Sequence, residues 1–150
     1  MHDSAVIANR FLTLAEEQSD TLTPMQLLKL VYIAHGWMLG LYGTPLIRDE
    51  VQAWEYGPVI PKLYSRTRKF KSSPVQGALD QRSRAALTPR EQDLIEQIYD
   101  KYGHLSGPAL SRITHAPGTP WASVYEPGSF GTSIPDDLIE DHYRRLASQA

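Results

Sequence analysis

Few side chains in this 150-residue sequence have the type and spacing that catalysis or metal binding requires. No two of its five histidines lie three or four residues apart, so no pair of imidazoles shares a helical face as metal ligands do. The chain has no cysteine, which excludes disulfides, thiolate metal sites and a cysteine nucleophile. Neither a Gly-x-Ser-x-Gly elbow nor a phosphate-binding glycine loop is present. We therefore predict no enzyme activity, no metal site and no cofactor.

Two polar residues, Lys29 and His35, interrupt the longest apolar stretch, residues 27–41. A buried imidazole needs a partner for each polar nitrogen, and a buried ammonium favours an acidic partner from another segment. Two interpretations are open, a polar network placed for catalysis and a satisfied core network that fixes helix packing. The lack of a nucleophile motif favours the core network, while His35 and His115 remain the candidates for a hydrolase.

The elements that position these residues have clear helix-start signals. Thr23-Pro24 and Thr88-Pro89 are each followed by a Gln or Glu that completes a capping box, which predicts helices over 24–41 and 89–102. The first of these is apolar on nearly all sides, as is typical of a central helix. Further helices are predicted over 4–15, from 61 onward, and over 106–115, 120–125 and 135–147.

Residues 46–61 do not follow a helical pattern. In Trp54-Glu55-Tyr56-Gly57-Pro58-Val59-Ile60-Pro61 two prolines fix the backbone and Gly57 permits an unusual angle. Together with the preceding residues, this segment predicts a short β-hairpin or two extended pieces. A rigid aromatic segment can present side chains to a partner, and it can equally be a corner that packs Trp54 on the central helix. The expected fold is mainly α, a single compact helical domain over residues 1–150 around a buried central helix, with this one extended insert.

Charge is unevenly distributed along the chain. Residues 1–61 carry a net −4, residues 62–90 a net +7 and residues 91–150 a net −5. The basic middle fits an interaction surface, a nucleic-acid patch or a solvated loop. An overall pI of about 6.2 argues against nucleic acid as the main partner. Residues 71–87 have few large apolar side chains and are predicted to be a mobile loop.

No signal peptide or membrane span is apparent, so we expect a cytoplasmic protein with no membrane partner. The absence of cysteine fits a reducing compartment.

Several segments together resemble the Panacea-domain family, the SocA-like antitoxins, which also includes GepA-like phage-associated proteins. The matching residues are KLVYIAHGW at 29–37, Pro45-Leu46, AWEYGPVIP at 53–61 with Leu63-Tyr64, LSRITH at 110–115, and Pro120-Trp121. The spacing between the first two of these blocks also fits the family.

The resemblance implies a largely helical antitoxin that binds its cognate protein toxin directly. At least one relative is an adaptor that delivers its toxin to a protease, so a AAA+ protease is a second expected partner, and homo-oligomerisation stays open. The alternative function is a nucleic-acid-binding transcriptional regulator of its own operon. The motif residues expected to be structural are Lys29, Tyr32, His35, Trp37, Gly57, Thr114, His115 and Trp121.

We hypothesise that the aromatic–Gly–Pro segment and the neighbouring helix face form the toxin-binding surface. The residues expected to contact the partner are Trp54, Tyr56, Pro58, Ile60, Lys62 and Arg66.

Overall fold

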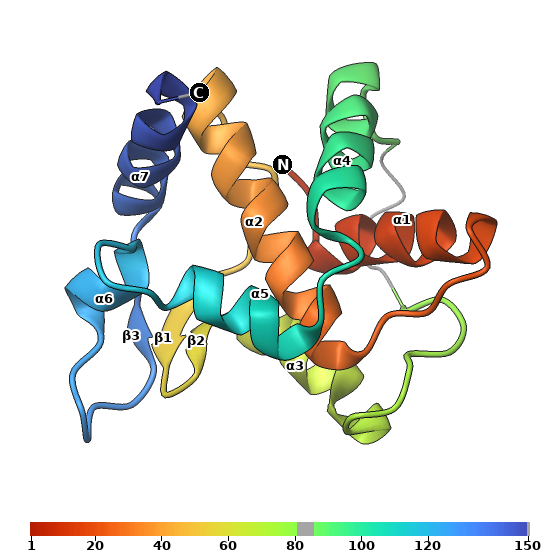
Figure 1. Cartoon of the computed structure of the whole chain (residues 1–150), viewed down its shortest axis with the longest axis horizontal. Coiled ribbons are helices and arrows are strands. Elements are labelled where there is room, and N and C mark those ends of the chain that lie inside the picture. Colours follow the sequence, from red (N-terminus) through yellow and green to blue (C-terminus); the bar gives the residue numbers. More distant parts are fainter. Residues whose placement is uncertain (81–85, 150) are drawn as a thin grey trace.

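Helix α2 (Pro24–Tyr42) runs through the middle of the computed structural model, which describes residues 1–80 and 86–149 (Figure 1). It begins with the predicted capping box, in which Thr23 and Gln26 each bond the other's backbone N–H. It ends at Gly43, whose φ of 69° is the left-handed conformation that glycine favours at a helix C-terminus. Its residues are buried on nearly every side, which confirms its prediction as the central helix.

The other elements surround α2, with α1, α4, α5 and α7 all in contact with it. Their bounds are α1 (Ser4–Glu17), β1 (Gln52–Trp54), β2 (Gly57–Val59), α3 (Pro61–Thr67), the 3₁₀ turn η1 (Arg68–Phe70), α4 (Pro89–Tyr102), α5 (Gly107–Thr114), α6 (Pro120–Val124), β3 (Thr132–Ser133) and α7 (Asp136–Ser148). The fold is mainly α with one small sheet, as predicted.

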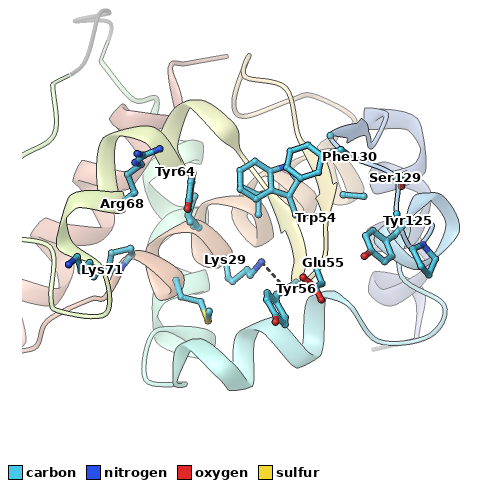
Figure 2. A pocket seen from close by; sticks show the side chains of 18 residues that line it. Lys29, Trp54, Glu55, Tyr56, Tyr64, Arg68, Lys71, Tyr125, Ser129 and Phe130 are labelled. Carbon is cyan, nitrogen blue, oxygen red and sulfur yellow. Dashed lines mark hydrogen bonds between the residues drawn. The ribbon is translucent and has the colours of Figure 1, made fainter.

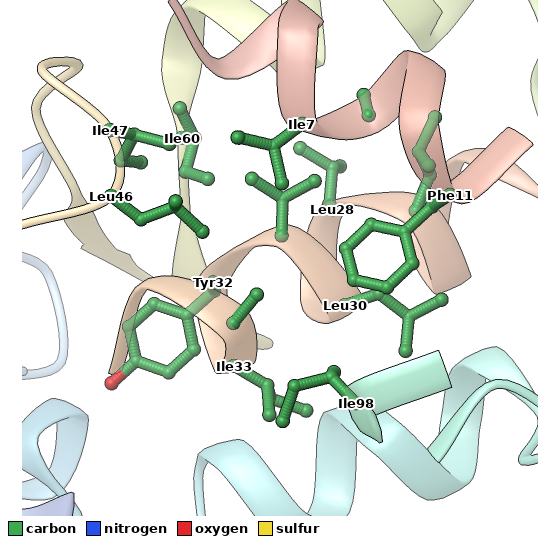
Figure 3. Packing of buried hydrophobic residues seen from close by; sticks show 14 of the residues in the cluster. Ile7, Phe11, Leu28, Leu30, Tyr32, Ile33, Leu46, Ile47, Ile60 and Ile98 are labelled. Atoms are coloured by element: carbon green, nitrogen blue, oxygen red, sulfur yellow. The ribbon is translucent and has the colours of Figure 1, made fainter. Parts of the chain in front are cut away.

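The hydrophobic core is continuous across α1, α2 and α4. Figure 3 shows aliphatic and aromatic side chains from these helices meeting in one cluster with residues from the segment between α2 and α3; among them are Ile7, Phe11, Leu30, Ile33, Leu46, Ile60 and Ile98. Burial of such apolar side chains is the main favourable contribution to the free energy of folding. Within the described residues, no helix has both the length and the apolar character needed to cross a membrane.

Helix α7 packs unusually close to α2 because two glycines face it. A Cβ at Gly36 would overlap the Tyr143 ring, and one at Gly40 would lie 2.6 Å from Cβ of Tyr143. The ring of Trp37 meets the Tyr143 ring edge-on with 5.2 Å between centroids. The motif residue Gly36 therefore sets a helix–helix distance, as small residues do where two backbones approach.

The sheet is antiparallel in the order β2-β1-β3. Trp54 pairs with Gly57 in the β1–β2 hairpin, which confirms the predicted hairpin, and Ala53 pairs with Thr132 of β3. Strand β3 has two exposed residues and no apolar alternation, so its sequence carries no strand signal.

The predicted mobile loop, residues 71–87, is attached to neighbouring segments at its described residues Val75 and Leu79. The Val75 N–H donates to the Leu22 carbonyl at 2.8 Å. The Leu79 N–H donates to Asn9 Oδ1 at 2.7 Å, and Asn9 Nδ2 donates back to the Leu79 carbonyl at 2.8 Å. Residues 81–85, on which part of the prediction falls, lie outside the described residues, and mobility stays a prediction.

Candidate partner-binding cleft

Lys29 is buried beneath the β1–β2 turn, with 3% of its surface exposed. Its Nζ donates to the Pro58 carbonyl at 2.9 Å and to the Tyr56 carbonyl at 3.4 Å. The expectation of an acidic partner is therefore wrong, because the turn directs backbone carbonyls at the ammonium. Burial removes the charge from water and lowers the pKa of Lys29 to about 8.

Two more helices bond carbonyls of the same turn. Ser111 Oγ of α5 donates to the Tyr56 carbonyl at 2.7 Å, and Trp121 Nε1 of α6 donates to the Trp54 carbonyl at 2.6 Å. The carbonyls of residues 54, 56 and 58 are thus all held by side chains from α6, α5 and α2. We call Lys29, Ser111 and Trp121 the turn clasp; it fixes the hairpin relative to three helices.

Gly57 lies at the centre of this arrangement. Its φ of 116° is a conformation that L side chains rarely adopt, and a Cβ there would lie 3.1 Å from Lys29 Nζ and 3.5 Å from Thr114 Oγ1. His115 lies beside them, with its ring edge-on to Trp121 at 5.4 Å between centroids. The expected structural residues Lys29, Gly57, Thr114, His115 and Trp121 therefore meet at one point.

A cleft of about 880 Å³ opens beside the clasped turn (Figure 2). The first half of α2, the hairpin, the α3–η1 segment and the loop before β3 all line it. Its lining residues are Pro24, Met25, Leu28, Lys29, Ala53, Trp54, Glu55, Tyr56, Val59, Tyr64, Arg68, Lys71, Tyr125, Pro127, Gly128, Ser129, Phe130 and Gly131. The volume and the mixture of aromatic and polar groups are typical of binding sites.

Aromatic side chains are prominent around this cleft. Tyr56 is 66% exposed and Phe130 is 97% exposed, whereas most large apolar side chains of the described chain are buried. Trp54 and Tyr64 meet edge-on with 5.0 Å between ring centroids. Exposed aromatic side chains on a rigid frame are the residues that dominate binding energy at protein interfaces.

Two of the six residues expected to contact a partner line the cleft, and four do not. Trp54 and Tyr56 line the cleft. Pro58 and Ile60 are buried, because β2 is enclosed by α2 and α5 rather than exposed along one face, so neither side chain is available to a partner in this conformation.

The two basic residues of that set also lie outside the cleft lining. Lys62 is exposed on α3. Arg66 Nη1 bonds both carboxylate oxygens of Asp3, at 2.9 and 3.1 Å, and so ties α3 to the residue that caps α1. Besides the buried Lys29, the cations that line the cleft are the exposed Arg68 and Lys71, further along the same segment.

Sequence reasoning missed the loop before β3. Phe130 lies between Gly128 and Gly131, both with positive φ, in a segment that has no helix or strand period. A large aromatic residue between two glycines was the available signal. Its position beside the hairpin depends on β3 pairing with β1, which the sequence does not reveal.

His35 is fully buried on α2 and does not line the cleft. Its Nδ1 accepts hydrogen bonds from the Leu46 and Ile47 N–H groups at 3.2 and 3.3 Å, and its Nε2 bonds Asp136 Oδ1 at 2.9 Å. Because two N–H groups point at Nδ1, the proton of a neutral imidazole belongs on Nε2. Both nitrogens are satisfied, as the core-network interpretation expects.

Two other motif residues, Tyr32 and Trp37, pack against Tyr143 of α7. Burial raises the pKa of the Tyr32 hydroxyl above its usual range. Among the residues that the structure describes, no group of three or more His, Asp or Glu side chains is arranged to hold a metal ion.

Comparison with known proteins gives two matches. The family described as Antitoxin SocA-like, Panacea domain, matches residues 27–122, a range that includes the turn clasp and ends before Phe130. Over 158 aligned residues the chain is 30% identical to Antitoxin SocA of Caulobacter vibrioides (strain NA1000 / CB15N), with 95% of this chain and 82% of that protein covered. No solved structure is significantly similar to the chain.

Proposed function

Because the chain belongs to the SocA-like antitoxin family with a Panacea domain, we propose that it neutralises a cognate protein toxin by binding it directly through the cleft beside the β1–β2 turn. The observation that carries the proposal is the exposure of Tyr56 and Phe130 next to a turn held by three helices. In this proposal the chain acts in the cytoplasm and without catalysis.

The turn clasp supports tight binding because it orders the surface in advance. Binding normally loses free energy when loops and side chains become ordered at the interface, about 0.5–1.5 kcal/mol per flexible side chain. The hydrogen bonds to the Trp54, Tyr56 and Pro58 carbonyls restrict the backbone that carries the aromatic side chains before any partner arrives. More of the contact energy of those rings then remains as affinity.

The family match divides this surface into two parts. The clasp lies inside residues 27–122, whereas Phe130 and its glycine-flanked loop lie outside that range. A common frame with a separate loop suits recognition of one particular toxin, since loops on a rigid scaffold are where specificity is built.

The test uses Tyr56→Ser and Phe130→Ser, singly and together, with Tyr42→Ser as the matched control. Tyr42 is 43% exposed on α2 and does not line the cleft. The toxin is the product of the neighbouring reading frame that arrests growth when expressed alone. We expect the double variant to lose neutralisation and to bind the toxin at least about 100-fold more weakly, as loss of two hot spots does. If it neutralises like the control, the proposed surface is wrong.

Delivery of the toxin to a AAA+ protease would use the same surface. A second experiment distinguishes delivery from neutralisation by binding alone. Neutralisation by binding alone persists in a host that lacks its AAA+ proteases, and the toxin level stays constant. Loss of neutralisation in that host, with the toxin accumulating, would show that this chain is an adaptor.

A further inference from the structure

We propose that the cleft holds an extended, acidic segment of the toxin, with a bulky apolar side chain against Trp54 and Tyr56 and a carboxylate at Arg68 and Lys71. This inference rests on the proposed function and specifies the chemistry of the segment that is bound. It follows from the way apolar and charged groups divide the cleft.

The apolar part of the cleft lies on α2 and the hairpin. Met25 and Leu28 of α2 line the cleft together with Trp54 and Tyr64. Met25 is 41% exposed, and a flexible thioether beside aromatic rings adapts to a branched or aromatic side chain of a partner. This part selects a large apolar residue but no particular charge.

The charged part is strongly asymmetric. Arg68 and Lys71 lie at the η1 end of the cleft, across from Tyr125 and Ser129 (Figure 2). Glu55, at the hairpin turn, is the one carboxylate among the described residues that line the cleft. Lys29 also lines the cleft, but it is buried and its Nζ donates to the Tyr56 and Pro58 carbonyls. The exposed cations therefore attract a carboxylate of the partner toward η1, and Glu55 repels it from the turn, which orients an extended segment along the cleft.

The cations at the η1 end have no acidic partner within the described part of the chain, unlike Arg66 and Arg10. Arg66 is paired with Asp3 at 2.9 Å and Arg10 with Glu96 at 2.9 Å, whereas no ion pair of Arg68 or Lys71 is present among the described residues. Two neighbouring cations repel each other, and a carboxylate bound beside them lowers their electrostatic energy. A carboxylate from a bound segment supplies it.

The backbone at Lys71 is also unusual. Its φ of 54° with a ψ of −115° is a strained conformation that favours glycine, and the described chain has one other non-glycine residue, Ser19, with positive φ. The chain turns away from η1 at Lys71, and the Lys71 side chain lines the cleft at that position.

The experiment compares two double charge reversals of equal net charge. Arg68→Glu with Lys71→Glu removes the exposed cations of the cleft, and Lys69→Glu with Arg112→Glu changes two exposed cations that do not line the cleft. The probe is the toxin from the neighbouring reading frame. We expect the cleft reversal to weaken binding by about tenfold or more and to reduce its salt dependence, and the control to change affinity by less than about threefold.

A photo-crosslinking residue at position 56 identifies the bound segment. We expect it to contain an Asp or Glu near a bulky apolar residue, and we expect replacement of that acid by Lys to restore binding to the cleft reversal.

Equal binding by both reversals, or a cross-linked segment without an acid, overturns this inference while the proposed function stands. Failure of the wild-type chain to bind the toxin overturns the proposed function. If the cleft reversal loses affinity for a mixed-sequence DNA duplex and keeps it for the toxin, the cations serve nucleic acid and the inference is wrong.

Discussion

Lys29 and His35 are two buried polar residues of α2 that bind the two ends of the segment between α2 and α3. One of them donates hydrogen bonds to that segment and the other accepts them. His35 accepts hydrogen bonds from the N–H groups of Leu46 and Ile47, where the chain has just left α2. Lys29 donates to the carbonyls of Tyr56 and Pro58, where the chain returns. Each side chain matches the backbone group that faces it, an acceptor for amides and a donor for carbonyls.

The difference between them is one of accessibility and charge. His35 can satisfy its site as a neutral ring inside the core, whereas Lys29 is a cation at the wall of the cleft, with burial opposing its charge. Similar anchoring by two residues of one helix thus gives a site enclosed in the core at one end and the frame of the proposed binding surface at the other.

The largest effect is expected when His35 is replaced. His35→Leu keeps an apolar volume but leaves two buried N–H donors and the Asp136 carboxylate without their partner, which should lower the free energy of unfolding by about 3 kcal/mol. Urea denaturation measures it. His104→Leu, at an exposed position, is the control. A loss below about 1 kcal/mol would show that His35 is not the anchor described here.

The second effect depends on pH. The pKa of Lys29 is about 8 in the fold and 10.5 in the unfolded chain, so between these values the unfolded chain binds more protons and stability rises with pH. Below pH 8 the buried charge costs about 3 kcal/mol, and above 10.5 this cost is gone. The neutral amine keeps two N–H groups for two carbonyls.

The unfolding free energy of the wild type, relative to Lys29→Met, should therefore increase by about 3 kcal/mol between pH 7 and pH 11. Comparing the two proteins at each pH cancels the titration of other groups. Lys62→Met, at an exposed lysine, should show a difference that stays flat with pH. A flat difference for Lys29→Met as well would mean that the ammonium is not desolvated.

The smallest effect is expected at Ser111. Ser111→Ala removes one donor from the Tyr56 carbonyl, which still accepts from Lys29, so stability should fall by only about 1 kcal/mol. Combining it with Lys29→Met leaves that carbonyl without either donor, and the double variant should lose more than the sum of the two single losses. Additive losses in a double-mutant cycle would show that the two donors act independently.

Much of the fold was predictable because its signals are local. The caps at Thr23 and Thr88 placed the starts of α2 and α4 correctly, since capping depends on residues within one turn of the helix. The hairpin was predictable from two prolines and Gly57, whose backbone restrictions act within the segment itself. Strand β3 has no such signal and forms because its backbone pairs with β1.

The sequence by itself determined the blocks that carry the family resemblance, among whose residues are Lys29, Gly57, Thr114 and Trp121. Only the tertiary structure decided that they meet at one turn, that Lys29 bonds carbonyls rather than an acid, and that Pro58 and Ile60 are buried. It also brought Arg68, Lys71 and Phe130 to the same cleft. The physical reason is that caps and backbone restrictions act within a few residues, whereas burial and charge pairing depend on segments far apart in the chain.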